Sequence, residues 1–174
     1  MHIVLHEPEI PFNTGAIGRT CVATDTALDL IYPLGFIIND KYVKRAGMDY
    51  WPRLKLQEYL DYDDFLHRNA GIEYGGETGT GSPKLWFATT KARQCYTDVR
   101  YGQDDYIMFG KESAGIPEEI LVAHPSSCVR IPMYGDIRSL NLSNSVAIVL
   151  FEALRQNGFA GLKEEGDLHR LSWD

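Results

Sequence analysis

The sequence predicts an α/β fold in which helices flank a mainly parallel β-sheet. Short apolar runs bounded by turn residues alternate with helical stretches, an order typical of parallel sheets. Of the 174 residues, 44% are hydrophobic and 24% are charged, which is ordinary for a globular protein. We therefore predict a single domain over residues 1–174, in which residues 162–174 form a polar tail.

Five apolar runs are predicted strands, and four other segments are predicted helices. The strands are His2–Glu7, Leu28–Pro33, Lys84–Thr90, Asp105–Gly110 and Cys128–Pro132. The helices are Thr14–Asp25, Tyr62–Asn69, Pro117–Ala123 and Leu142–Gln156. The glycine-rich segment Glu73–Pro83 lacks phosphate-binding spacing, so we interpret it as a flexible surface insertion.

The predicted helix Leu142–Gln156 carries apolar residues around almost its whole circumference. Such a helix must be buried on all sides, whereas the sheet of one small domain covers only one side. A second copy of the chain could cover the other side, and long loops of the same chain are the alternative. The sequence favours a dimer.

The net charge of −7 argues against a nucleic-acid partner, because neutralising phosphates usually supplies most of the affinity. Charge is unevenly distributed, however. Residues 41–55 contain five basic residues and one acidic residue, a net of +4, so the remainder carries −11. This run fits a basic RNA-binding patch and a solvated basic loop equally well.

Several classes of protein are disfavoured. The three cysteines follow no metal or disulfide pattern, which favours reduced thiols in a cytoplasmic protein. We expect no signal peptide and no membrane span, because no long apolar stretch occurs. The five histidines show no metal-ligand spacing, and no Gly-x-Ser-x-Gly nucleophile motif occurs, so we expect no metal.

Three segments are candidates for chemistry, because each leads from a predicted strand into a helix, where ligands of α/β proteins collect. Asn13–Thr20 combines glycines with Arg19, which suits a phosphate or a hydroxyl. Met108–Pro117 contains a strand that ends in Gly110. Ile131–Ser145 has more serine and asparagine than one helix cap needs. Taken singly, each also fits an ordinary structural role.

Together and in this order, the three segments resemble the three motifs of the SPOUT methyltransferases. The patterns are Asn-x-Gly-x-x-x-Arg-Thr, Phe-Gly-x-Glu-x-x-Gly-Ile-Pro, and Ile-Pro-Met followed by Ser-Leu-Asn-Leu-Ser-Asn-Ser-Val-Ala. More narrowly, Val4–Pro11 and Lys44–Tyr50 resemble the small tRNA (cytidine/uridine-34)-2′-O-methyltransferases of the TrmL/YibK type. Members of this group lack an added RNA-binding domain.

The resemblance implies an enzyme that uses S-adenosyl-L-methionine and releases S-adenosyl-L-homocysteine. It also implies a homodimer and a deep trefoil knot in the C-terminal third, a topology that general rules do not predict. The cofactor would be bound by the knotted loops, with Glu112 and Asn141 as supporting residues. By matched position, these residues are Ala88, Gly110, Glu112, Ile131, Ser139, Leu140 and Asn141.

The resemblance assigns catalysis to Arg19, which would reach the pocket of the partner subunit. Because arginine stays protonated, we expect it to hold the ribose 2′-hydroxyl and the adjacent phosphate rather than to act as a free base. Some relatives carry tyrosine where this chain has Phe151, so no role for a phenol carries over.

The implied substrate is the wobble nucleotide, position 34, in the anticodon loop of certain tRNAs. The residues expected to bind RNA are Arg19, Lys41, Lys44, Arg45 and Tyr50. Alternatives are a ribosomal RNA ribose 2′-O-methyltransferase and a non-catalytic, knotted RNA-binding dimer. A nicotinamide dehydrogenase is disfavoured, because Gly-x-Gly-x-x-Gly is absent.

Overall fold

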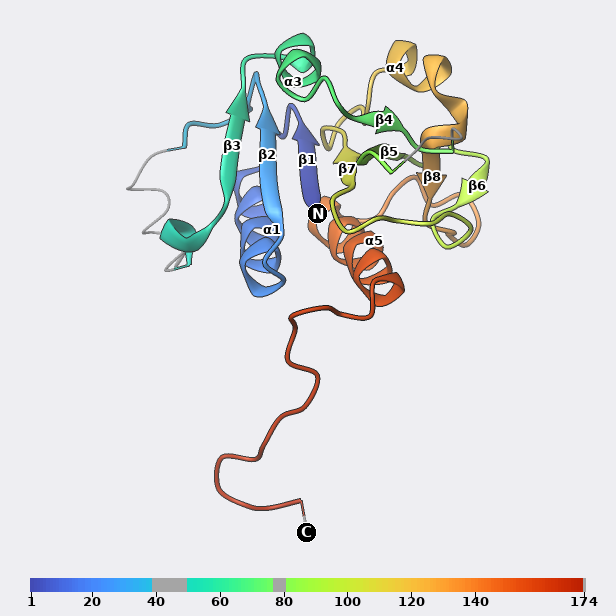
Figure 1. Cartoon of the computed structure of the whole chain (residues 1–174). Helices are drawn as coiled ribbons and strands as arrows, with labels where there is room; N and C mark the ends of the chain where they lie inside the picture. The colour runs from blue at the N-terminus through green and yellow to red at the C-terminus, as the bar shows by residue number, and fades with distance from the viewer. Residues whose placement is uncertain (39–49, 77–80, 174) are drawn as a thin grey trace.

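The computed structural model describes residues 1–38, 50–76 and 81–173. Their strands pair in parallel in one sheet, in the order β3-β2-β1-β7-β5-β8-β6, with β4 beside β5 (Figure 1). The strands are β1 (His2–His6), β2 (Ala27–Ile31), β3 (Leu56–Tyr59), β4 (Glu73–Tyr74), β5 (Lys84–Ala88), β6 (Gln94–Cys95), β7 (Tyr106–Phe109) and β8 (Cys128–Arg130). The predicted fold class, a mainly parallel sheet flanked by helices, is confirmed, whereas the knot stays a prediction.

Helices cover both faces of the sheet (Figure 1). The two long helices, α1 and α5, pack against one face and contact each other. The two short helices, α3 and α4, contribute to the core on the other face. The helices are α1 (Pro11–Ala23), α3 (Tyr62–Arg68), α4 (Glu118–Ala123) and α5 (Leu142–Gln156), with 3₁₀ turns η1 (Trp51–Arg53) and η2 (Pro125–Ser127).

The central strands are buried on both faces, which explains why they read as continuous apolar runs in the sequence. Along β1, Ile3 and Leu5 join the core beneath α1 and α5, whereas Val4 joins the core on the opposite face. All three side chains have no exposed surface. The alternation of a strand thus divides one apolar run between two cores.

The predicted elements are present, with shifts at their ends. α1 begins at Pro11, three residues before the predicted start, because proline fits the first turn of a helix, where no N–H is needed. The edge strand β3 was not predicted, since Gln57 and Glu58 are exposed and interrupt the apolar pattern. The two-residue strands β4 and β6 are too short to leave a sequence signal.

The interpretation of Glu73–Pro83 as a flexible insertion is wrong for its first residues. Glu73 and Tyr74 form β4 beside β5. A Cβ on Gly75 would lie only 2.4 Å from the Trp86 ring, and the Ser127 hydroxyl donates a 2.7 Å hydrogen bond to the Gly75 carbonyl. The glycine therefore permits close packing rather than flexibility. Residues 77–80 lie outside the described part of the chain.

α5 is only partly buried within one copy of the chain. Val146, Val149, Leu150 and Ala153 are fully buried against the sheet and α1, whereas Phe151 is 47% exposed. The covering of this outer side by a second copy stays a prediction. After α5, residues 162–173 contain no helix or strand and extend away from the body (Figure 1).

Candidate active site

A cavity of about 570 Å³ lies where β5, β7 and β8 end. Its volume falls within the range of small-molecule sites. All seven residues that the resemblance assigns to the cofactor line this one cavity. They are Ala88, Gly110, Glu112, Ile131, Ser139, Leu140 and Asn141. The three predicted segments, far apart in sequence, thus meet at the same end of the sheet.

The cavity combines apolar walls with polar groups at its edge. Phe109, Val129 and Leu142 contribute apolar surface, and the turn that follows β7 contributes backbone groups. Lys91, Lys111 and Arg138 are the cations among its described lining residues. An apolar wall beside backbone donors and acceptors suits an uncharged ring system that carries polar edges, such as a nucleoside.

Gly110 is required by the turn that follows β7. A Cβ at this position would lie 2.0 Å from the carbonyl carbon of Gly115 and 2.1 Å from the Ile116 nitrogen. Gly115 closes the turn through a 2.8 Å hydrogen bond from its N–H to the Lys111 carbonyl, and its φ is +74°. The two glycines of the second motif therefore shape the cavity wall through the backbone alone.

A chain of hydrogen bonds, which we call the motif link, joins Glu112, Asn13 and Asn141. Asn13 Nδ2 donates to Glu112 Oε1 at 2.9 Å, and Asn13 Oδ1 accepts from Asn141 Nδ2 at 3.0 Å. Asn141 Oδ1 in turn accepts from the backbone N–H groups of Ser143 and Asn144, and so caps α5. One residue from each motif takes part in the link.

Glu112 also serves the start of α1. The N-cap residue Ile10 has no side-chain cap of its own. Instead, the Glu112 carboxylate accepts from the N–H of Glu9 at 2.8 Å and from the N–H of Ile10 at 3.3 Å. A negative charge is favourable at a helix N-terminus. Glu112 therefore fixes α1 against the turn after β7.

The segment between β1 and α1 makes two further contacts with that turn. The N–H and hydroxyl of Ser113 donate to Glu9 at 2.9 and 2.8 Å, and these bonds lower the pKa of the Glu9 carboxyl. Lys111 pairs with Glu7 at 2.8 Å, which raises the pKa of the lysine. No role for Glu7, Glu9 or Asn13 was predicted, although all three lie in segments that carry the resemblance.

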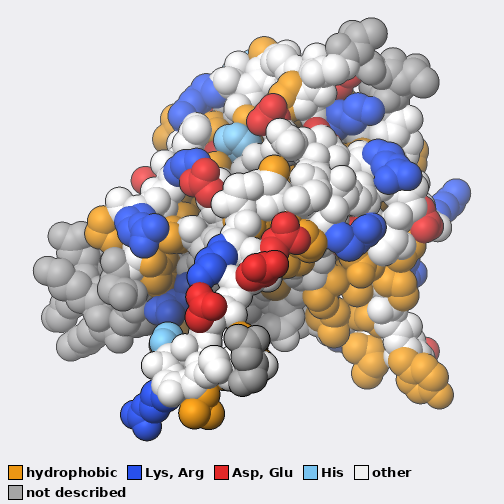
Figure 2. All heavy atoms as spheres, turned by 60° about the horizontal axis from the view of Figure 1, so that its bottom comes forward, with side chains coloured by type: hydrophobic (Ala, Val, Ile, Leu, Met, Phe, Trp, Pro, Cys, Tyr) orange, Lys and Arg blue, Asp and Glu red, His pale blue; other side chains and the backbone are white. Residues whose placement is uncertain are grey.

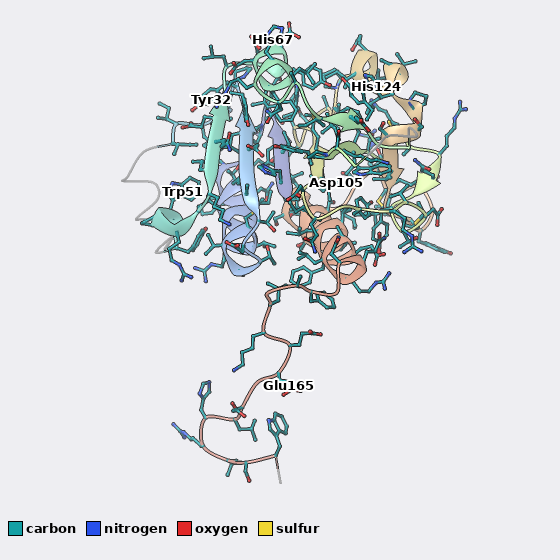
Figure 3. All side chains as sticks on the ribbon, viewed as in Figure 1. Tyr32, Trp51, His67, Asp105, His124 and Glu165 are labelled. Atoms are coloured by element: carbon teal, nitrogen blue, oxygen red, sulfur yellow. The ribbon has the colours of Figure 1, made fainter. Side chains whose placement is uncertain are left out.

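Arg19 does not line the cavity of its own chain. It is exposed on α1, where its guanidinium lies 4.9 Å from the centroid of the Tyr50 ring. The Tyr50 hydroxyl donates to the Gly15 carbonyl, and Trp51 packs beside Gly18. Figure 3 labels Trp51 on the turn next to α1. The structure thus brings Arg19 and Tyr50 together. Lys41, Lys44 and Arg45 lie outside the described residues.

Two basic residues of the predicted run 41–55 lie in the described part of the chain. Lys55 pairs with Asp25 at 2.7 Å, whereas Arg53 is exposed. On the face drawn in Figure 2, basic and acidic side chains are interspersed rather than separated into one basic surface.

Comparison with known proteins identifies the family. Residues 1–151 match the SpoU rRNA Methylase family. This chain belongs to that family. The tRNA (cytidine(34)-2′-O)-methyltransferase of Photorhabdus asymbiotica is 47% identical over 167 residues, which cover 94% of this chain and 99% of the relative. The predicted resemblance is confirmed.

Two solved structures share the fold of this chain. A structure from work on the 2-OH methylation of C/U34 on tRNA has a TM-score of 0.78 and 37% identity, and it covers 90% of this chain and 95% of that chain. An AdoMet-bound rRNA methyltransferase from Sinorhizobium meliloti has a TM-score of 0.71 and 25% identity, covering 88% of this chain but only 55% of that longer chain.

Within the described ranges, no group of three or more His, Cys, Asp or Glu residues is arranged to hold a metal ion. Cys21, Cys95 and Cys128 are free thiols, and burial raises the pKa of Cys21 to about 12, which makes it a poor nucleophile. None of the described helices is long and apolar enough to cross a membrane.

Proposed function

We propose that this protein transfers the methyl group of S-adenosyl-L-methionine to the ribose 2′-hydroxyl of nucleotide 34 in certain tRNAs. The observation that carries the proposal is the convergence of all three motifs on one cavity. The names of the relatives, which match this chain over nearly their whole length, support the tRNA substrate. Such a substrate also supports a cytoplasmic location.

The cavity fits the cofactor in size and in chemistry. S-adenosyl-L-methionine, when bound, supplies an activated methyl group on a positively charged sulfur. Ala88, Ile131 and Leu140 would contact it, together with the backbone around Gly110 and Ser139. Glu112 and Asn141 would hold the walls in place, because their side chains are already engaged in the motif link.

The position of Arg19 supports catalysis across a homodimer. On α1, Phe12, Ala16 and Arg19 share an exposed side, and Phe12 is 78% exposed. On the neighbouring α5, Phe151 is also exposed. Pairing two copies over this surface would cover both aromatic rings and would carry Arg19 toward the partner's cavity. There the guanidinium would hold the 2′-hydroxyl and the adjacent phosphate in line with the methyl group.

The test is methylation of total tRNA with labelled S-adenosylmethionine, followed by mapping of the methylated nucleoside by mass spectrometry. We expect label at the 2′-oxygen of nucleotide 34. Label confined to ribosomal RNA would contradict the proposal and would favour the second candidate, a ribosomal RNA enzyme, which the family name suggests. Binding of tRNA without transfer would instead favour a non-catalytic role.

A variant of Arg19 tests the assigned mechanism. Arg19→Ala should abolish transfer while cofactor affinity stays within about twofold, because Arg19 lies outside its own cavity. The exposed tail residue Arg170 provides a matched control, and Arg170→Ala should keep full activity. Sedimentation velocity should give the mass of a dimer for all three proteins. Equal loss of cofactor binding and transfer in Arg19→Ala would overturn this role.

A further inference from the structure

Of the three cations that line the cavity, two are already paired. Lys91 lies 2.7 Å from Glu118, and Lys111 lies 2.8 Å from Glu7. Arg138, which belongs to the third motif, makes no ion pair or hydrogen bond with any residue that the structure describes. It is exposed at the edge of the cavity. The rim of the cavity thus presents one guanidinium that can pair with an anionic group of a ligand.

An aromatic ring stands close to this arginine in the sequence. Tyr134 is 95% exposed, and both Met133 and Arg138 line the cavity on either side of it along the chain. Gly135, with a φ of +59°, turns the backbone directly after the tyrosine. Within the described residues, the Tyr134 ring contacts no other aromatic ring or cation. The loop therefore carries the unpaired guanidinium of Arg138 and the uncovered ring of Tyr134 beside the cofactor cavity.

Methyl transfer restricts where the acceptor nucleotide lies. The reacting oxygen must approach the methyl carbon to about 3–3.5 Å, so the ribose sits at the mouth of the cavity. The phosphates on that ribose and the neighbouring bases must then lie over its rim. Proteins recognise single-stranded loops by stacking bases on aromatic rings and by pairing phosphates with arginine.

We propose that Arg138 binds a phosphate of the target nucleotide and that Tyr134 stacks on a base beside it. This inference rests on the proposed RNA methyltransferase activity, and it places part of the RNA site in the third motif rather than only in residues 41–55. Arg19 would keep its proposed place at the ribose, and Arg138 would hold a second phosphate contact beside it.

A second copy of the chain is the competing occupant of this loop, because Ile137 and Leu140 are also exposed there. The charge of Arg138 favours RNA. A protein surface that covered the loop would bury an unpaired guanidinium at a large cost, unless it supplied an acidic partner. A phosphate supplies that charge itself. Asp136 lies nearby in the sequence but forms no ion pair with Arg138 within the described part of the chain.

The experiment measures tRNA methylation kinetics for Arg138→Ala, Arg138→Lys, Tyr134→Ala and Tyr134→Phe. We expect Arg138→Ala to raise KM for tRNA about tenfold and to flatten its dependence on salt, since one phosphate contact is lost. Arg138→Lys should recover part of this loss. Tyr134→Ala should raise KM about fivefold to tenfold, and Tyr134→Phe should match the unchanged protein, because stacking needs the ring and not the hydroxyl.

Two further measurements distinguish the other outcomes. The Kd of S-adenosylmethionine, measured by calorimetry, should be unchanged in every variant. A rise in this Kd for Arg138→Ala that is as large as the rise in KM for tRNA would show that the arginine binds the cofactor instead. Sedimentation should show an unchanged oligomeric state. A dissociated Tyr134→Ala protein with normal KM would favour the second copy. Trp173→Ala, another exposed aromatic, should change nothing. If the unchanged protein methylates no RNA, the proposed function fails instead.

Discussion

Replacing Glu112 with alanine should weaken the fold at the point where α1 meets the turn after β7. The Glu112 carboxylate accepts three N–H donors, at 2.8, 2.9 and 3.3 Å. The longest bond is exposed and contributes little. Buried hydrogen bonds to a charged group contribute about 1.5–3 kcal/mol each, and Glu112 is half-buried. After allowing for replacement by water, we expect Glu112→Ala to lower the free energy of unfolding by about 2–3 kcal/mol.

Urea denaturation at one fixed protein concentration measures this loss, since the stability of a dimer depends on concentration. Glu112→Gln keeps one acceptor oxygen and should cost about 1 kcal/mol. Glu119 is exposed in the first turn of α4, and Glu119→Ala should stay within about 0.5 kcal/mol of the unchanged protein. A loss for Glu112→Ala no larger than that of Glu119→Ala would refute the reasoning.

A double-mutant cycle isolates the bond between Asn13 and Glu112. Because Asn13→Ala removes the same 2.9 Å bond, the double variant should be less destabilised than the sum of the single variants by about 1 kcal/mol. Both single variants should also weaken binding of S-adenosylmethionine by about tenfold, since Asn13 and Glu112 hold two walls of the cavity together. If the stability losses of the single variants are strictly additive and their affinity for S-adenosylmethionine is unchanged, the motif link does not hold the cavity walls in place.

Three other changes have definite outcomes. Gly110→Ala should prevent the turn from closing, because its Cβ would lie 2.0 Å from Gly115, and we expect a loss of about 3 kcal/mol or more by urea denaturation, or insoluble protein. Asp105 is buried and accepts from the backbone N–H groups of Lys84 and Gly102 and from the Trp86 indole. Asp105→Ala should therefore cost about 3 kcal/mol in the same assay, and a loss below about 1 kcal/mol would contradict this account. Burial lowers the pKa of His6, so the unfolded chain binds more protons just below pH 6.5 and stability falls as the pH drops through this range. His6→Phe should make the unfolding free energy less sensitive to pH between about 7.5 and 5.5, and an unchanged slope would show that His6 does not titrate in this way.

The central strands and the long helices could be predicted from local patterns. Strands buried on both faces give continuous apolar runs, and α5 lies at the predicted bounds Leu142–Gln156, where Asn141 begins the helix and an Asn-Gly pair ends it. The edge strand β3 could not be predicted in this way, because Gln57 and Glu58 face solvent. Its place in the sheet depends on pairing with β2, which is a tertiary contact.

The residues of the site could be predicted, but most of their contacts could not. The seven cavity residues came from the family resemblance, by matched position, rather than from any spacing, since Ala88 and Leu140 carry no chemical signal of their own. The contacts of Asn13 could not be foreseen, because its partners lie 99 and 128 residues away in the chain. The prediction placed Glu112 beside the cofactor as a support. The structure shows how Glu112 gives this support, since its carboxylate accepts hydrogen bonds from backbone N–H groups at the start of α1.

These contacts connect the cofactor cavity to Arg19. Asn13 and Arg19 lie six residues apart on one continuous helix, so they are separated by about two turns. A helix of this length moves nearly as a rigid body, and its N-terminal end is fixed by Glu112 and Asn141 through the motif link. We therefore expect a shift of the cavity walls to shift α1 and, with it, the Arg19 guanidinium. The three motifs are better understood as parts of one hydrogen-bonded unit than as three separate binding elements. The second motif shapes the cavity, the third motif begins α5, and the first motif positions the arginine proposed to act on the ribose.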